Sequence, residues 1–155
     1  MSTSNVLRQA LSRVGLAGAL ALAGLAYAAD PIGYVKTVTG AASVGVNGQA
    51  SKAEPGTPIM IGSLLKTGPG AAMGITFKDN TVMSFGPNTE VTVDEYLYAP
   101  AQGQLKLGTR LGKGTMNYVS GVIAKLKPEA VTVQTPAGII GVRGTQFVAR
   151  VEDEQ

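Results

Sequence analysis

Residues 135–151, which read TPAGIIGVRGTQFVARV, decide how the C-terminal part of the chain folds. The stretch begins with a Thr-Pro-x-Gly turn, continues through an apolar pair, and breaks at a Gly-Val-Arg-Gly segment. From Thr145 onward, every second residue falls on one face of an extended chain, and Phe147, Ala149 and Val151 share that face. The pattern therefore predicts a strand, a sharp corner and a second strand.

This stretch resembles the closing signature of the FecR domain family, in which a Thr-Pro segment leads to an Arg-Gly-Thr-x-Phe strand. The residues that fit the signature are Thr135, Pro136, Arg143, Gly144, Thr145 and Phe147. Residues 62–68 (GSLLKTG) look like the family's Gly-x-x-Leu-x-Thr-Gly segment, and residues 77–82 (FKDNTV) like its strand, Asp-Gly-Ser turn and returning strand. The resemblance spans residues 32–151, and Asn80 replaces a usual Gly at a turn position that Asn tolerates.

The first 28 residues have the three parts of a secretory signal peptide. Arg8 and Arg13 give a positive start, residues 14–25 are an apolar run, and Ala26-Tyr27-Ala28 is a small-x-small cleavage site. The run is shorter than the roughly 20 apolar residues of a membrane span, which disfavours an uncleaved anchor. We expect cleavage after Ala28, a periplasmic or secreted location, and no stable membrane insertion afterwards.

Composition excludes several classes of function. Removal of the leader takes away two of the thirteen basic residues and none of the ten acidic ones, which leaves 127 residues with a net charge of +1. A net charge this close to zero does not indicate a nucleic-acid-binding protein, which usually carries a clear excess of basic residues. Cys and His are both absent, so disulfides, His or Cys zinc sites and Ser-His or Cys-His catalytic pairs are excluded. We expect no metal and no cofactor.

The rest of the chain predicts one all-β domain over residues 29–155. Strand patterns recur over residues 32–39, 42–46, 59–67, 72–78, 81–85, 89–98, 104–107, 115–120 and 131–151, with turn residues between them. Asn47-Gly48 is a hairpin signal, and residues 50–58 are predicted to form a loop. Alternation places Met73, Ile75 and Phe77 on one strand face, and it places Val91, Val93 and Leu97 on one face of the next long strand with Tyr96 on the other. Residues 122–127 fit either a strand or a single helical turn. Short strands with Gly at most corners favour a compact β-solenoid-like roll, as the resemblance also implies, with a β-sandwich as the alternative. Most of these strands are too short for an outer-membrane barrel, and proline interrupts them.

No residue pattern points to an enzyme. Glu90, Asp94 and Glu95 lie close together in sequence, but they are predicted to line a solvated strand face with nothing to separate their pKa values. Ser63 and Lys66 are three residues apart, a spacing that puts strand residues on opposite faces. Tyr96 and Tyr98 are two apart and predict a short aromatic stripe, which suits either packing at the rim or stacking on a sugar ring.

We therefore expect a non-enzymatic module of the cell envelope that senses a signal or binds a protein. Family members are often the periplasmic part of a transmembrane sigma-factor regulator. Because no cytoplasmic helical domain precedes residue 29 and nothing follows Gln155, we expect this chain to act through a separate partner, such as an outer-membrane receptor or a cell-wall assembly. The alternative is a glycan-binding or peptidoglycan-binding domain that uses Tyr96 and Tyr98.

The resemblance also implies a candidate bond for self-cleavage. Some sigma-regulating relatives divide at a Gly-Thr bond, which corresponds here to Gly144-Thr145. In that chemistry the Thr145 hydroxyl attacks the preceding carbonyl, an ester forms by acyl shift, and water opens the ester. We favour the simpler interpretation, in which Gly144 turns the chain and Thr145 begins a strand.

Overall fold

The computed structural model describes residues 29–152, so the predicted signal peptide lies outside the described residues. Its strands are β1 (Gly33–Thr39), β2 (Ala42–Val46), β3 (Gln49–Lys52), β4 (Pro58–Ile59), β5 (Leu64–Thr67), β6 (Ala72–Phe77), β7 (Val82–Phe85), β8 (Glu90–Ala99), β9 (Gln104–Val119), β10 (Val131–Thr135), β11 (Gly138–Gly141) and β12 (Gln146–Val151). Three short helical turns accompany them: η1 (Pro100–Gln102), α1 (Val122–Leu126) and η2 (Pro128–Ala130). None of these described helices is long and apolar enough to cross a membrane.

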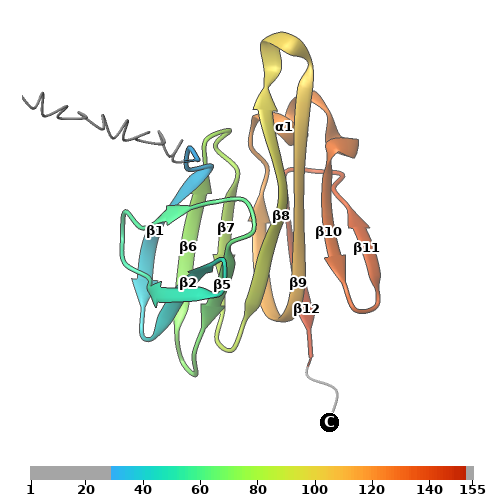
Figure 1. The fold of residues 1–155 in the computed structure, drawn as a ribbon. Helices are drawn as coiled ribbons and strands as arrows, with labels where there is room; N and C mark the ends of the chain where they lie inside the picture. Colours follow the sequence, from blue (N-terminus) through green and yellow to red (C-terminus); the bar gives the residue numbers. More distant parts are fainter. Residues whose placement is uncertain (1–28, 153–155) are drawn as a thin grey trace, which may run out of the picture.

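The twelve strands form one sheet that curls around a shared core (Figure 1). The main path runs β3-β2-β5-β8-β9-β7-β6-β1-β4, and β10, β11 and β12 extend from β9 on its other side. All pairings are antiparallel except the one between β9 and β10. The predicted all-β class is confirmed. The solenoid-like roll is not confirmed, since this antiparallel pairing does not build it.

Strand β9 joins the two halves of the curled sheet. Its first part pairs with β8 and, over Leu107–Arg110, with the parallel strand β10. Its last part pairs with β7 and β12. The chain bends between these parts at Gly114, where φ is +90°. The sequence analysis placed two separate strands here, interrupted by glycines. That prediction was wrong, because β9 runs on for 16 residues: Gly108 pairs with Glu95 of β8, and Gly112 lies at a register shift that the strand passes without ending.

A buried threonine occupies the inside of the β9 bend. The Thr89 hydroxyl accepts a hydrogen bond from the Thr115 N–H at 3.0 Å and donates to the Gly86 carbonyl at 2.9 Å. Thr67 donates its own hydroxyl to the same carbonyl at 2.6 Å and accepts the Thr89 N–H at 3.0 Å. These bonds connect β5, the β7–β8 turn and β9, so the bend is fixed by contacts that are far apart in sequence.

The core lies inside the curl and is almost entirely aliphatic and aromatic. The predicted inward face of β6 is confirmed, since Met73, Ile75 and Phe77 are all buried. Its opposite wall comes from β5, β8 and the first part of β9. The fully buried large side chains are Tyr118, Phe77, Ile59, Leu65, Met73, Ile75, Met83, Leu107, Leu111, Met116, Ile123 and Val35. Burial of this apolar surface is the main favourable contribution to folding.

The predicted faces of β8 are wrong for its second half, because the strand contains a β-bulge. The register shifts between Val93 and Glu95, so one extra residue interrupts the alternation. Val91 and Val93 are buried as predicted, but after the bulge Tyr96 turns inward and Leu97 is 44% exposed. The sequence analysis placed Leu97 with the two valines and Tyr96 on the other face. Strict alternation fails here because a bulge changes the parity of every later residue.

Three further segments differ from the sequence expectations. The segment after the Asn47-Gly48 turn was predicted to be a loop, but it continues the hairpin as β3. The predicted strand over residues 59–67 is divided into β4 and β5, with a turn at Gly62 where φ is +84°. The ambiguous segment over residues 122–127 is helical, as α1. The predicted Asn47-Gly48 hairpin is confirmed, with positive φ at both turn residues.

We expect Gly114→Ala to lower the free energy of unfolding by about 2–5 kcal/mol, because a methyl group at this positive φ overlaps Thr89. Gly112→Ala is the matched control, two residues earlier on the same strand. A Cβ at Gly112 lies 3.7 Å from the nearest atom, the Glu90 carbonyl oxygen, so its effect is expected to stay near 1 kcal/mol. Urea unfolding of both variants measures the difference, and equal midpoints would contradict the role assigned to the bend.

Candidate functional site

The closing signature forms the hairpin and corner that its sequence predicts. Thr135 and Pro136 make the turn between β10 and β11, where the Thr135 hydroxyl donates to the Gly138 carbonyl at 2.9 Å. Phe147 comes after the corner, and its ring stacks on Tyr118 with centroids 4.9 Å apart. These three residues therefore have structural contacts of their own, one set at the exposed turn and the other at the core.

The Gly144-Thr145 corner is held by Ser120, the residue that directly follows β9. The Ser120 hydroxyl donates to the Gly144 carbonyl, and the Ser120 N–H donates to the Thr145 carbonyl, both at 2.8 Å. Gly144 has a φ of +127°, a conformation that L side chains rarely adopt, so a glycine suits this position. The corner carries β11's chain across to β12, and Ser120 is 8% exposed at its base. The sequence offered no signal for this contact.

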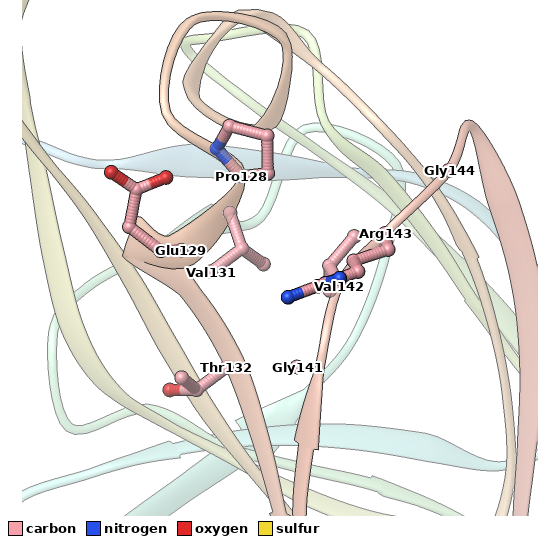
Figure 2. Close-up of a pocket in the computed structure, with 8 residues that line it drawn as sticks. All are labelled: Pro128, Glu129, Val131, Thr132, Gly141, Val142, Arg143 and Gly144. Carbon is pink, nitrogen blue, oxygen red and sulfur yellow. The ribbon is translucent and has the colours of Figure 1, made fainter.

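Arg143 lines an open pocket of about 630 Å³ (Figure 2). One wall comes from η2 and the start of β10, and the other from the end of β11 and the corner. Figure 2 shows the guanidinium group directed back across the pocket toward Val131 and Thr132. The lining residues are Pro128, Glu129, Val131, Thr132, Gly141, Val142, Arg143 and Gly144. The lining is predominantly apolar, with one cationic and one anionic side chain.

Within residues 29–152, Arg143 belongs to none of the six ion pairs. Lys125 on α1 and Lys127 just before η2 belong to none of them either. Glu129 lies on the opposite wall, and its carboxylate points away from the pocket in Figure 2. The pocket and the helical turns beside it thus carry three cationic side chains. Within the described residues, no carboxylate forms an ion pair with any of them.

The carboxylates of β8 form ion pairs across the outer face of the sheet. Glu90 contacts Lys66 at 3.1 Å, Glu95 contacts Lys106 at 3.0 Å, and Asp94 contacts Arg110 at 3.1 Å. The side chains on both sides of these pairs are between about a third and a half exposed, so each pair contributes little to stability. Their arrangement fits the solvated strand face that the sequence analysis expected.

The turn of the second upstream motif contains a buried carboxylate. Asp79 is fully buried, and its side chain accepts hydrogen bonds from the Thr81 hydroxyl at 2.8 Å, the Ile123 N–H at 3.1 Å and the Tyr96 hydroxyl at 3.3 Å. Asn80 takes a φ of +64°, as expected for an Asn in a usual Gly position. Asp79 therefore ties the β6–β7 turn to α1 and to β8.

Tyr96 and Tyr98 do not form a fully exposed aromatic surface. The Tyr96 ring stacks on Phe77 with centroids 5.4 Å apart, and its hydroxyl accepts the Asp79 N–H at 3.0 Å. Both tyrosines are partly buried against the core. One face of Tyr96 is thus occupied by Phe77. Sugar binding at these two residues stays a prediction.

The comparison with protein families decides the family of this chain. The model described as FecR protein matches residues 63–155, which is more than half of the sequence. The chain belongs to the FecR family. The match covers the closing signature and most of both upstream motifs, and the family is associated with signal transduction and sensing. Comparison with curated proteins and with solved structures gave no match.

We expect the stability of this FecR domain to fall above pH ~10, the usual pKa of tyrosine. Burial and the Asp79 carboxylate raise the pKa of Tyr96. The unfolded state therefore ionises first as the pH rises, and the free energy of unfolding decreases. Tyr96→Phe should make this decrease shallower, and Tyr118, whose pKa burial also raises, should retain part of it. Denaturant unfolding between pH 7 and pH 11 measures both profiles.

Tyr98→Phe is the control for this prediction at neutral pH. Tyr98 makes none of the hydrogen bonds to Asp79, whereas Tyr96→Phe leaves the Asp79 N–H without its acceptor. We expect Tyr96→Phe to cost about 1–3 kcal/mol at pH 7 and Tyr98→Phe to cost less. Superimposable pH profiles for wild type and Tyr96→Phe would refute the coupling between the phenol and the buried carboxylate.

For the Gly144-Thr145 bond we expect a structural corner and an intact chain. The carbonyl of the bond itself, on Gly144, and the next carbonyl, on Thr145, both accept hydrogen bonds from Ser120, which fixes the corner. Intact-mass spectrometry of the freshly purified protein, repeated over several days, should show one species for wild type and for Thr145→Ala. Two fragments that separate at this bond in wild type, but not in Thr145→Ala, would establish self-cleavage instead.

Proposed function

We propose that this FecR domain is a protein-interaction and signal-sensing module of the cell envelope that contacts its partner through the Arg143 pocket. The observation that carries the proposal is the position of Arg143. Thr135 and Gly144 hold the hairpin turn and the corner, and Phe147 packs on the core. Arg143 has no ion pair within the described residues and faces an open apolar pocket.

The chemistry of the pocket suits a protein segment that carries a carboxylate beside an apolar side chain. A guanidinium group binds a carboxylate through two parallel hydrogen bonds, which gives direction as well as affinity. Val131 and Val142 form the buried apolar base of the pocket, and Pro128 adds an exposed apolar side chain at its wall. Arg is also among the residue types that most often dominate binding energy at protein interfaces.

The sequence supports a proposal for the location of the protein and for the class of its partner. We propose that the chain is exported, processed after Ala28 and active in the periplasm or outside the cell without catalysing a reaction. An outer-membrane receptor or a cell-wall assembly is the proposed partner. A mass spectrum of the exported protein would also report its first residue, which we expect to be Ala29.

Arg143→Gln tests the proposal, because it removes the charge while keeping a polar side chain with hydrogen-bond donors, although the chain is shorter. Immobilised wild-type domain is incubated with solubilised envelope proteins, and the retained partner is identified and titrated against each variant. We expect Arg143→Gln to weaken binding at least about tenfold, the effect of losing roughly 1.4 kcal/mol. Arg110→Gln is the matched control, since Arg110 lies on the outer sheet face in an exposed pair with Asp94.

Two results would contradict this function. Equal affinity of wild type and Arg143→Gln for every retained protein would remove the pocket from the interface. Cosedimentation of the domain with purified peptidoglycan, reduced by Tyr98→Ala and unchanged by Arg143→Gln, would favour the glycan-binding alternative. The Tyr98 variant is the better probe of that alternative because Tyr96 also stacks on Phe77 and bonds Asp79.

A further inference from the structure

Strand β12 is an open edge of the curled sheet. It pairs with β9 along its whole length, from Gln146 opposite Val119 to Val151 opposite Gly114, and with no other described strand. The edge strands elsewhere are shorter or polar. β4 has two residues, and β3 has four residues that are all exposed and include Lys52. An edge of six residues without proline is a template for pairing with another chain.

The register shows which backbone groups of β12 point outward. The Ser120 N–H donates to the Thr145 carbonyl, so the backbone groups of Thr145 face β9. Because these groups alternate in direction along an antiparallel pair, those of Gln146, Val148 and Arg150 face away from β9. Each of these three residues therefore offers an N–H and a carbonyl group at the open edge.

The side chains along this edge suit a second strand. Val148 lies in the middle of β12 and is 65% exposed, although it is apolar. On the other face of the strand, Phe147 and Val151 pack against the core and Ala149 is buried. The strand thus has an apolar inner face along its length and an exposed apolar residue at the centre of its outer face.

We propose that two copies of this domain associate through β12, antiparallel, around a two-fold axis at Val148. In this register the outward backbone groups of each copy meet those of the other copy in hydrogen-bonded pairs. Val148 lies opposite Val148 of the second copy, and Gln146 lies opposite Arg150 of the second copy. Phe147 lies opposite Ala149 of the second copy, which continues the apolar inner face across the axis.

Self-complementarity of the strand favours a second copy as the occupant. No two like charges lie opposite each other in this register, whereas charges of one sign placed directly opposite are destabilising. A two-fold interface needs only one surface that fits itself, and it closes at two copies. The edge of β11 is a weaker candidate, because it has four residues and begins and ends with Gly.

Proline at position 148 tests the interface with little effect on the fold. The Val148 N–H points away from β9, so proline removes no bond of the β9–β12 ladder, and proline is tolerated on edge strands in this orientation. It does remove both N–H donors of the central pair across the two-fold axis. We expect light scattering to show a dimer for wild type and for Val148→Thr, and dissociation at least about tenfold easier for Val148→Pro.

A single engineered cysteine tests the register, because the chain has no cysteine of its own. Opposed residues in a hydrogen-bonded pair have Cα atoms ~5.5 Å apart, a separation that a disulfide spans. We expect Val148→Cys to form a covalent dimer under mild oxidation. Arg150→Cys should not, since the proposed register places it opposite Gln146 of the second copy. Ile139→Cys, on the edge of β11, is a control for random collision.

Three results would overturn the proposal. A monomer at every protein concentration would exclude the dimer. A dimer unaffected by Val148→Pro, with the variant shown by circular dichroism and thermal unfolding to be folded, would place the interface elsewhere. Equal crosslinking of Val148→Cys and Ile139→Cys would indicate random collision and no pairing of β12 with β12. None of these measurements depends on the Arg143 pocket, so the two proposals fail separately.

Discussion

The bend of β9 around the Thr89 hydroxyl is the constraint on which the rest of this fold depends. One strand of 16 residues serves both halves of the sheet only if it changes direction without breaking its ladders. Gly114 permits the bend, since a side chain there would overlap Thr89. Thr89 in turn supplies the acceptor for the Thr115 N–H at the point where the strand turns. Four neighbouring strands depend on this geometry for their placement around the core.

Each of the three family motifs contains or contacts a residue that hydrogen-bonds to a distant part of the chain. Thr67, from the first motif, bonds to the turn that carries Thr89. Asp79, from the second, receives the Ile123 N–H through its side chain and the Val122 N–H through its carbonyl. The closing signature is tied to the end of β9 by Ser120. Arg143 differs from these residues, because its charged group lies over a pocket and does not connect two parts of the chain.

These connections also determine the shape of the pocket. One wall comes from η2 and the start of β10, and α1, which precedes η2 in the chain, is bonded to Asp79. The other wall leads into the corner that Ser120 holds. The surface around Arg143 is therefore supported by two polar contacts, one buried at Asp79 and one partly buried at Ser120. The open edge of β12 begins just after the same corner, so both proposed contact surfaces originate in the closing signature.

The sequence by itself determined the all-β class, the family, the Asn47-Gly48 hairpin and the inward face of β6, because these depend on local turn chemistry and on alternation within one strand. Only the tertiary structure decided that β9 is one bent strand and that a bulge turns Tyr96 inward. It also decided that Asp79 is buried and that Arg143 faces a pocket. Each of these features is produced by contacts between residues far apart in the chain, such as Thr89 with Thr115 and Ser120 with Gly144. Local patterns contain no information about such partners.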